Sequence, residues 1–120
     1  MSNCIELANH VVTFTTSEID VERFRNFLYS IPKTEPEGHD VGNGAWWYLA
    51  QNTDFVSDKV VIRFGCGRSS HTWRDFRYVV NKIILPFMKG KKSHRFSCRD
   101  ESDGFAKAYP LEVTFGEEMA

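Results

Sequence analysis

The sequence predicts an α+β fold in which two helices lie on one face of an antiparallel sheet. Two observations lead to this prediction: amphipathic helical segments over residues 18–31 and 72–88, and strand-like segments that precede, separate and follow them. The order is strand, helix, strand, strand, helix, strand, with a further strand at the C-terminus. This is the order of the ferredoxin-like split βαβ sandwich, with a four- to five-stranded sheet. A different strand order within the same class stays open.

The first strand and helix are predicted over residues 10–31. The segment "HVVTFTT" (10–16) is rich in β-branched residues and partly alternates, which is typical of a strand. Ser17 stands three residues before Asp20, the spacing of a capping box, and Pro32 ends the helix. Between them the apolar positions recur at helical intervals, at Val21, Phe24, Leu28 and Ile31.

Two further strands are predicted at 46–51 and 58–66. The segments "WWYLAQ" and "DKVVIRFGC" are rich in aromatic and β-branched residues, and "NTDFVSD" (52–58) is predicted to turn between them. Residues 33–45 combine Pro, Gly and acidic residues without apolar periodicity, which indicates a solvated loop. A loop of this length is either functional or mobile.

The second helix is predicted over residues 72–88. At 100° per residue its apolar side chains fall on one arc, and Pro86 is expected to kink or end the helix. The apolar arc comprises Trp73, Phe76, Val80, Ile83, Ile84 and Phe87, and the polar side comprises Arg74, Tyr78, Asn81 and Lys82. Alternating apolar and polar residues then predict half-buried strands at 93–99 and 111–115.

The composition is that of one soluble globular domain spanning residues 1–120. Of the 120 residues, 42% are hydrophobic and 26% charged, which suits an ordinary core. No apolar run approaches the roughly 20 residues that cross a bilayer, and the N-terminus lacks the features of a secretion signal. The three cysteines are an odd number, which favours a reducing compartment over a disulfide framework. We therefore expect a cytoplasmic protein with no membrane partner.

Charge is unevenly distributed along the chain. Residues 1–57 carry a net charge of −5, residues 58–99 carry +9, and residues 100–120 carry −5. Such asymmetry bears on partners and association rather than on fold. Either the acidic ends neutralise the basic middle segment in the folded chain, or the middle segment presents a positive surface.

The junction "FGCGRSSHTWRDFR" (64–77) runs from a predicted strand into a predicted helix. A Gly-x-Gly turn before a helix start can direct backbone N–H groups at an anion. The third glycine of a dinucleotide fingerprint is absent, no P-loop Gly-Lys-Ser/Thr follows, and Thr72 with Asp75 has capping-box spacing. A structural turn is therefore favoured. The alternative is an anion-binding turn formed by Gly65, Gly67, Arg68, Ser69 and Ser70.

Two pairs of metal-ligand residue types occur, Cys66 with His71 and His94 with Cys98. The last two lie four positions apart in a predicted strand, so about 3.3 Å per residue places their Cα atoms about 13 Å apart. A zinc ion with bonds of about 2.0–2.3 Å cannot bridge that distance. We therefore expect no metal and no cofactor, with Cys98 in the core and His94 half-buried.

Candidate catalytic groups lack a pattern that assigns them to a mechanism. Cys66 as nucleophile would need His71 as its base and a third group to orient that base. Paired carboxylates would come from Glu35, Glu37 and Asp40 or from residues 100–103, and both clusters are predicted to be solvated turns. We expect no catalytic residues and no enzymatic activity.

Strand parity predicts an open sheet face that carries cations and aromatic side chains. If Val60 and Ile62 face the helices, Arg63 faces away from them. In the later strand, Arg95 and Arg99 likewise lie on the face opposite to Phe96. Such a face can stack bases and neutralise phosphates. The predicted binding residues are Trp46, Tyr48, Arg63, Arg74, Arg77, Lys91, Lys92, Arg95 and Arg99.

Two functions follow from this face. The first is non-enzymatic binding of a polyanion, either nucleic acid or a nucleoprotein, although a ribonucleoprotein motif is absent and the pI is about 6.4. The alternative is a protein-interaction module or inhibitor of a host protein, or a homodimer formed through the sheet face.

The stretch "NHVVTFTTSEIDVERFRNFL" (9–28) resembles the first strand and helix of small phage- and plasmid-encoded proteins with a ferredoxin-like domain. The resemblance covers about a sixth of the chain, contains no catalytic motif and implies no site residues. It implies an accessory protein of a phage or mobile element, of the kind that blocks a host factor.

Overall fold

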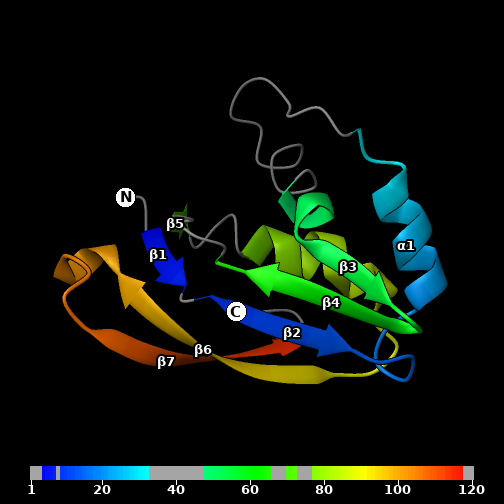
Figure 1. The fold of residues 1–120 in the computed structure, drawn as a ribbon. Helices are drawn as coiled ribbons and strands as arrows, with labels where there is room; N and C mark the ends of the chain where they lie inside the picture. Colours follow the sequence, from blue (N-terminus) through cyan, green and yellow to red (C-terminus); the bar gives the residue numbers. More distant parts are fainter. Residues whose placement is uncertain (1–3, 8, 33–47, 66–69, 73–76, 118–120) are drawn as a thin grey trace.

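The computed structural model describes residues 4–7, 9–32, 48–65, 70–72 and 77–117 (Figure 1). In these residues the fold is α+β, and the strands pair antiparallel in two sheets with the orders β5-β1-β6-β7 and β2-β4-β3. The strands are β1 (Cys4–Leu7), β2 (His10–Phe14), β3 (Thr53–Val56), β4 (Lys59–Phe64), β5 (Ser70–Thr72), β6 (Lys92–Asp100) and β7 (Ala108–Phe115).

Side-chain parity along the strands is as the sequence predicts. On β4, Ile62 is fully buried whereas Arg63 is exposed, and on β6 Phe96 and Cys98 are buried whereas Arg95 is exposed. Successive side chains of a strand point to opposite faces, so this alternation separates an inner from an outer face in each sheet.

The inner faces of the two sheets meet through edge-to-face aromatic contacts. Ring centroids lie 5.2 Å apart for Phe14 and Phe115 and 5.5 Å apart for Phe64 and Phe96. The helices complete the same core, because Phe24 of the first helix is fully buried there. In Figure 1 the helical segment 77–87 lies behind β4, and the first helix stands beside β3.

Helix α1 (Val21–Tyr29) begins three residues later than predicted. Asp20 is its N-cap and accepts a hydrogen bond from the Arg23 N–H (3.3 Å), so the predicted cap at Ser17 is wrong. Glu18 closes the preceding turn, since its carboxylate accepts from the N–H (2.8 Å) and the hydroxyl (3.1 Å) of Thr15. The apolar periodicity is confirmed for Val21, Phe24 and Leu28, which are buried, whereas Ile31 lies beyond the end of the helix and is half-buried.

The second helical segment begins later than predicted and is wider than an α-helix. Residues 70–72 form β5, which pairs with β1, so the predicted helix start at 72 is wrong. A π-helix, η1 (Val79–Ile84), is followed by a 3-10 turn, η2 (Leu85–Phe87), where Pro86 has no N–H to continue the helix. The buried residues of η1 are Val79, Val80, Ile83 and Ile84.

The strand predicted at 46–51 is wrong for residues 48–51, which form a helical turn, while residues 46–47 lie outside the described part. Aromatic content favours strands, but here the Asn52 N–H donates to the Tyr48 carbonyl (3.1 Å) and the Thr53 hydroxyl to the Leu49 carbonyl (2.6 Å). Strand β3 instead occupies 53–56, within the predicted turn. The hairpin reverses at Ser57, whose φ is 58°.

The described strands form two sheets, not the single sheet of four to five strands that was predicted, and a ferredoxin-like arrangement is not confirmed. The cause lies in the N-terminal segment. Its first half pairs with β6 up to Leu7, opposite Cys98, whereas from His10 onward it pairs with β4. The N-terminal segment thus leaves one sheet and enters the other. Among the described helices, none has the length and apolarity of a membrane span.

Candidate binding surfaces

The outer face of the β2-β4-β3 sheet carries both apolar and charged side chains. Val11 and Val56 are each 57% exposed and Val61 is half-buried. Cross-strand register places Val61 between Thr13 on β2 and Asp54 on β3. We call this surface the valine face, made of Val11, Thr13, Asp54, Val56, Lys59, Val61 and Arg63.

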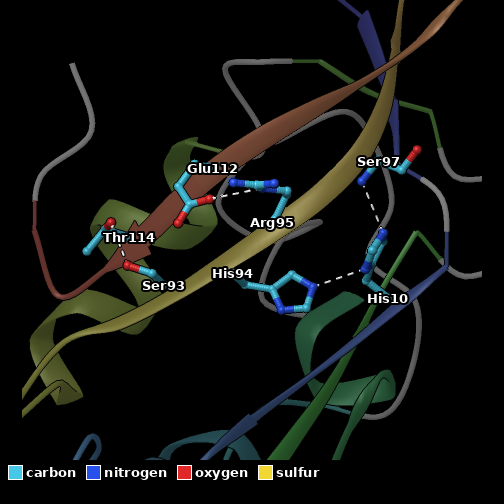
Figure 2. A network of polar contacts seen from close by, with 7 residues as sticks. All are labelled: His10, Ser93, His94, Arg95, Ser97, Glu112 and Thr114. Carbon is cyan, nitrogen blue, oxygen red and sulfur yellow. Dashed lines mark hydrogen bonds and ion pairs between the residues drawn. The ribbon is translucent and has the colours of Figure 1, made fainter.

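The outer face of β6 and β7 is polar. Ser93 lies opposite Thr114, with their hydroxyls 3.0 Å apart, and Arg95 lies opposite Glu112 (Figure 2). None of the outward positions of β6 and β7, nor of the valine face, holds an aromatic residue in the part of the chain that the structure describes. The predicted combination of cations and stacking aromatics is therefore not found on these outward strand positions.

Four predicted binding cations have carboxylate partners. Arg63 pairs with Asp54 (3.3 Å), Arg95 with Glu112 (3.4 Å) and Lys92 with Glu18 (3.7 Å), and Lys91 contacts Glu117. Every one of these acids lies outside the basic segment 58–99. The ends of the chain thus neutralise part of the basic middle segment. Arg99 is exposed and lies opposite Glu6 of β1 in the strand register.

The other predicted binding residues are not brought together on one face. Lys92 follows the inward parity of β6, and Arg77 is half-buried at the start of the second helical segment. Tyr48 is held by the end of β4: its hydroxyl donates to the Arg63 carbonyl (3.4 Å) and accepts from the Gly65 N–H (3.2 Å). Trp46 and Arg74 lie outside the described residues.

The candidate anion turn is described only at its two ends. Gly65 has a φ of 70°, the left-handed region that favours glycine, and its N–H already donates to Tyr48. Ser70 begins β5, with Glu6 as its register partner. Gly67, Arg68 and Ser69 lie outside the described residues. The choice between a structural turn and an anion-binding turn therefore stays untested.

A histidine pair lies between the two sheets and was not predicted from the sequence (Figure 2). His10 on β2 has Nδ1 3.0 Å from Nε2 of His94 on β6, and its own Nε2 accepts from the Ser97 N–H (3.1 Å). Both rings also contact Phe96, at centroid distances of 5.3 and 4.7 Å. Sequence parity indicated that His94 faces inward, but no local pattern could place His10 beside it, because the two residues lie far apart in the sequence.

The surroundings of His94, Cys98 and Asp100 shift the pKa of each group. Burial is the main cause that lowers the pKa of His94, and His10 and Lys92 lower it further while Glu112 opposes them. Burial raises the pKa of the Cys98 thiol to about 11, so the thiolate that a nucleophile or metal ligand requires is disfavoured. Hydrogen bonds from Ser102 lower the pKa of Asp100.

No described group has the geometry of a catalytic or metal site. No cluster of three metal-ligating side chains occurs among the described residues. His10 is a poor ligand as placed, since accepting from the Ser97 N–H at Nε2 leaves its ring proton on Nδ1, the atom that faces His94. Of the other catalytic candidates, Cys66 and the acids of 33–45 lie outside the described residues, and 101–103 are exposed.

Comparison of the chain with protein-family models, with curated proteins and with solved structures finds no match.

Proposed function

We propose that this chain is a non-enzymatic protein-interaction module whose partner is a protein that binds the valine face. The observation that carries the proposal is the composition of that face. It exposes Val11 and Val56 beside the ion pair of Arg63 with Asp54. Burying such valines stabilises a complex at about 25 cal/mol per Å² of apolar surface.

The charges around the valines would orient the partner. Lys59 and the Arg63–Asp54 pair border Val56 and Val61 through cross-strand register. An apolar centre with a polar rim is the arrangement of protein interfaces, and rim charges contribute more to specificity and association rate than to affinity.

Binding of a polyanion has less support. A phosphate backbone would have to displace the carboxylates of Asp54, Glu112, Glu18 and Glu117 from the cations that it contacts. Base stacking needs aromatic side chains on the surface, and the described outward strand positions offer none. Nucleic-acid binding is therefore an alternative outcome of the experiment below.

We also propose that the two sheets are parts of one strongly bent ferredoxin-like sheet. With β6 placed beside β2, the strand order becomes β3-β4-β2-β6-β7, the order expected for the split βαβ arrangement. The Ser97 N–H to His10 hydrogen bond crosses from β6 to β2 and supports this neighbourhood. The bent sheet would join the valine face to the β6–β7 outer face.

The function is tested by capture of partners from a lysate of the organism that encodes the chain, after nuclease treatment. Val11→Glu together with Val56→Glu should reduce the captured partner at least about tenfold, since the variant places two charges where apolar contact is expected. Its melting temperature should stay close to the parent's, because both side chains are exposed.

Tyr29→Glu is the matched control. Tyr29 is 72% exposed on α1, and its ring contacts Phe55, which faces the opposite side of β3 from Val56, so its replacement should leave capture unchanged. A partner that the valine-face variant retains in full would refute the proposed surface. If nuclease treatment removes all captured protein and the parent chain itself binds nucleic acid, the polyanion alternative would be favoured.

A further inference from the structure

The ladder between the N-terminal segment and β6 ends where the histidine pair begins. The last register partners are Leu7 and Cys98, and the next N–H along β6, that of Ser97, donates to the His10 ring instead of to a strand. His10 itself is already in the β2–β4 ladder, opposite Phe64. A side chain therefore replaces the backbone ladder at the boundary between the two sheets.

The hydrogen bonds fix the protonation state of both rings. A backbone N–H can only donate, so Nε2 of His10 accepts and the neutral ring carries its proton on Nδ1. That Nδ1–H points at Nε2 of His94, which must accept, so His94 carries its own proton on Nδ1. The chain Ser97 N–H to His10 to His94 needs two neutral imidazoles.

One added proton breaks this chain wherever it binds. On His10 it would occupy Nε2 and face the Ser97 N–H, donor against donor. On His94 it would occupy Nε2 and face the Nδ1–H of His10, and moving that proton to the other side of the ring would again oppose Ser97. No tautomer of the singly protonated pair satisfies both contacts.

The surroundings do not compensate for this loss. On β6, Lys92 adds positive charge, and its own partner is Glu18. On β7, Glu112 would favour a charged His94, but it is 3.4 Å from Arg95. The element on the other side, β4, contributes the apolar Phe64 opposite His10, and Phe96 contacts both rings.

We infer that the His10–His94 pair is an acid-sensitive connection between the two sheets, which holds β2 against β6 when both rings are neutral and releases it when either is protonated. The neutral rings stabilise the fold above the ordinary histidine pKa of about 6.5. This stabilisation is lost as the pH falls below that value and through the lowered pKa of His94.

The test compares unfolding constants, measured by urea denaturation, at about pH 7.5 and pH 5.5, on either side of the ordinary histidine pKa. For each proton that the unfolded state binds and the native state excludes, the unfolding constant of the parent should rise about tenfold as the pH is lowered over this interval. His10→Gln with His94→Gln should lack this rise, since a glutamine amide accepts and donates without titrating. His39→Gln with His71→Gln, the chain's other two histidines, should keep it.

An equal rise in the parent and in the His10/His94 variant would overturn the inference, as would loss of the rise in the His39/His71 variant. Imidazole nitrogen chemical shifts of the parent at the higher pH give a second readout that needs no variant. Both His10 and His94 should be neutral with the proton on Nδ1, and a proton on Nε2 of His10 would overturn the inference even if the glutamine variant does not fold.

Discussion

Single side chains set the ends of elements in this fold, and Asp20 is the clearest case. Its carboxylate accepts from the Arg23 N–H and lies 3.9 Å from the Arg23 guanidinium, so it both caps α1 and pairs weakly with an exposed cation. Asp20→Ala should lower the free energy of unfolding by about 1 kcal/mol, measured by urea denaturation.

Asp20→Asn separates the two contributions of that carboxylate. Asparagine caps helices about as well as aspartate, so this variant should retain most of the stability that alanine loses. If both variants lose the same amount, the charge and not the cap stabilises the start of α1.

At the same scale, the sequence predicted Cys98 in the core and His94 half-buried, and both are confirmed. These predictions needed only the two-residue period of a strand. The partner of His94 was missed, because contact between residues 10 and 94 depends on how two strands are placed in space. The predicted cap at Ser17 is wrong because Asp20 itself is the N-cap of α1. Thr15 and Glu18 have the same spacing as Ser17 and Asp20, but their hydrogen bonds close the turn before the helix.

Among the elements, the second helical segment depends most on its apolar face. Ile83 is 1% exposed, while its neighbour Lys82 is exposed. Ile83→Asp should lower the free energy of unfolding by at least about 4 kcal/mol, because it buries an unpaired carboxylate. Thermal denaturation measures this effect, and the cooperative unfolding transition should be lost.

Lys82→Asp is the matched control for that variant. It introduces the same carboxylate one residue away, on the solvent side, and should change the unfolding free energy by no more than about 0.5 kcal/mol. An Ile83→Asp protein with the same melting temperature as the parent would show that η1 does not pack as described.

Element types were easier to predict than element boundaries. The parity of β4 and β6 and the buried positions of α1 follow from local periods, and each is confirmed. The aromatic run before β3 predicts a strand, because propensity does not include side-chain to backbone hydrogen bonds such as that of Thr53 to Leu49. The π-helical widening of η1 buries Val79 as well as Val80, which a 100° period does not predict.

For the whole molecule, the decisive feature is where the opposite charges lie. The sequence showed a segment of +9 between two of −5 and left open whether they meet. Pairs such as Lys92 with Glu18 and Arg95 with Glu112 bring both ends of the chain to the basic segment. An exposed pair such as Arg95 with Glu112 contributes about 0 to 1 kcal/mol, so its larger effect is on the surface potential that a partner meets.

This neutralisation predicts weak and only slightly salt-dependent binding to a generic single-stranded oligonucleotide. The logarithm of the binding constant should fall with the logarithm of salt concentration with a slope shallower than about −2, because cations of the basic segment such as Arg63, Lys92 and Arg95 already pair with carboxylates. Fluorescence anisotropy at several salt concentrations measures this slope.

The variant that tests this slope carries Arg95→Glu and Arg99→Glu together. Its stability should stay close to the parent's. A small loss is expected because the carboxylate introduced at Arg95 repels Glu112, its cross-strand partner on β7. Because Arg95 is already paired in the parent, the slope should change by less than about 1. A parent slope of about −5 or steeper that becomes shallow in this variant would show that phosphates displace the carboxylates. Polyanion binding would then replace protein binding at the valine face as the proposed function.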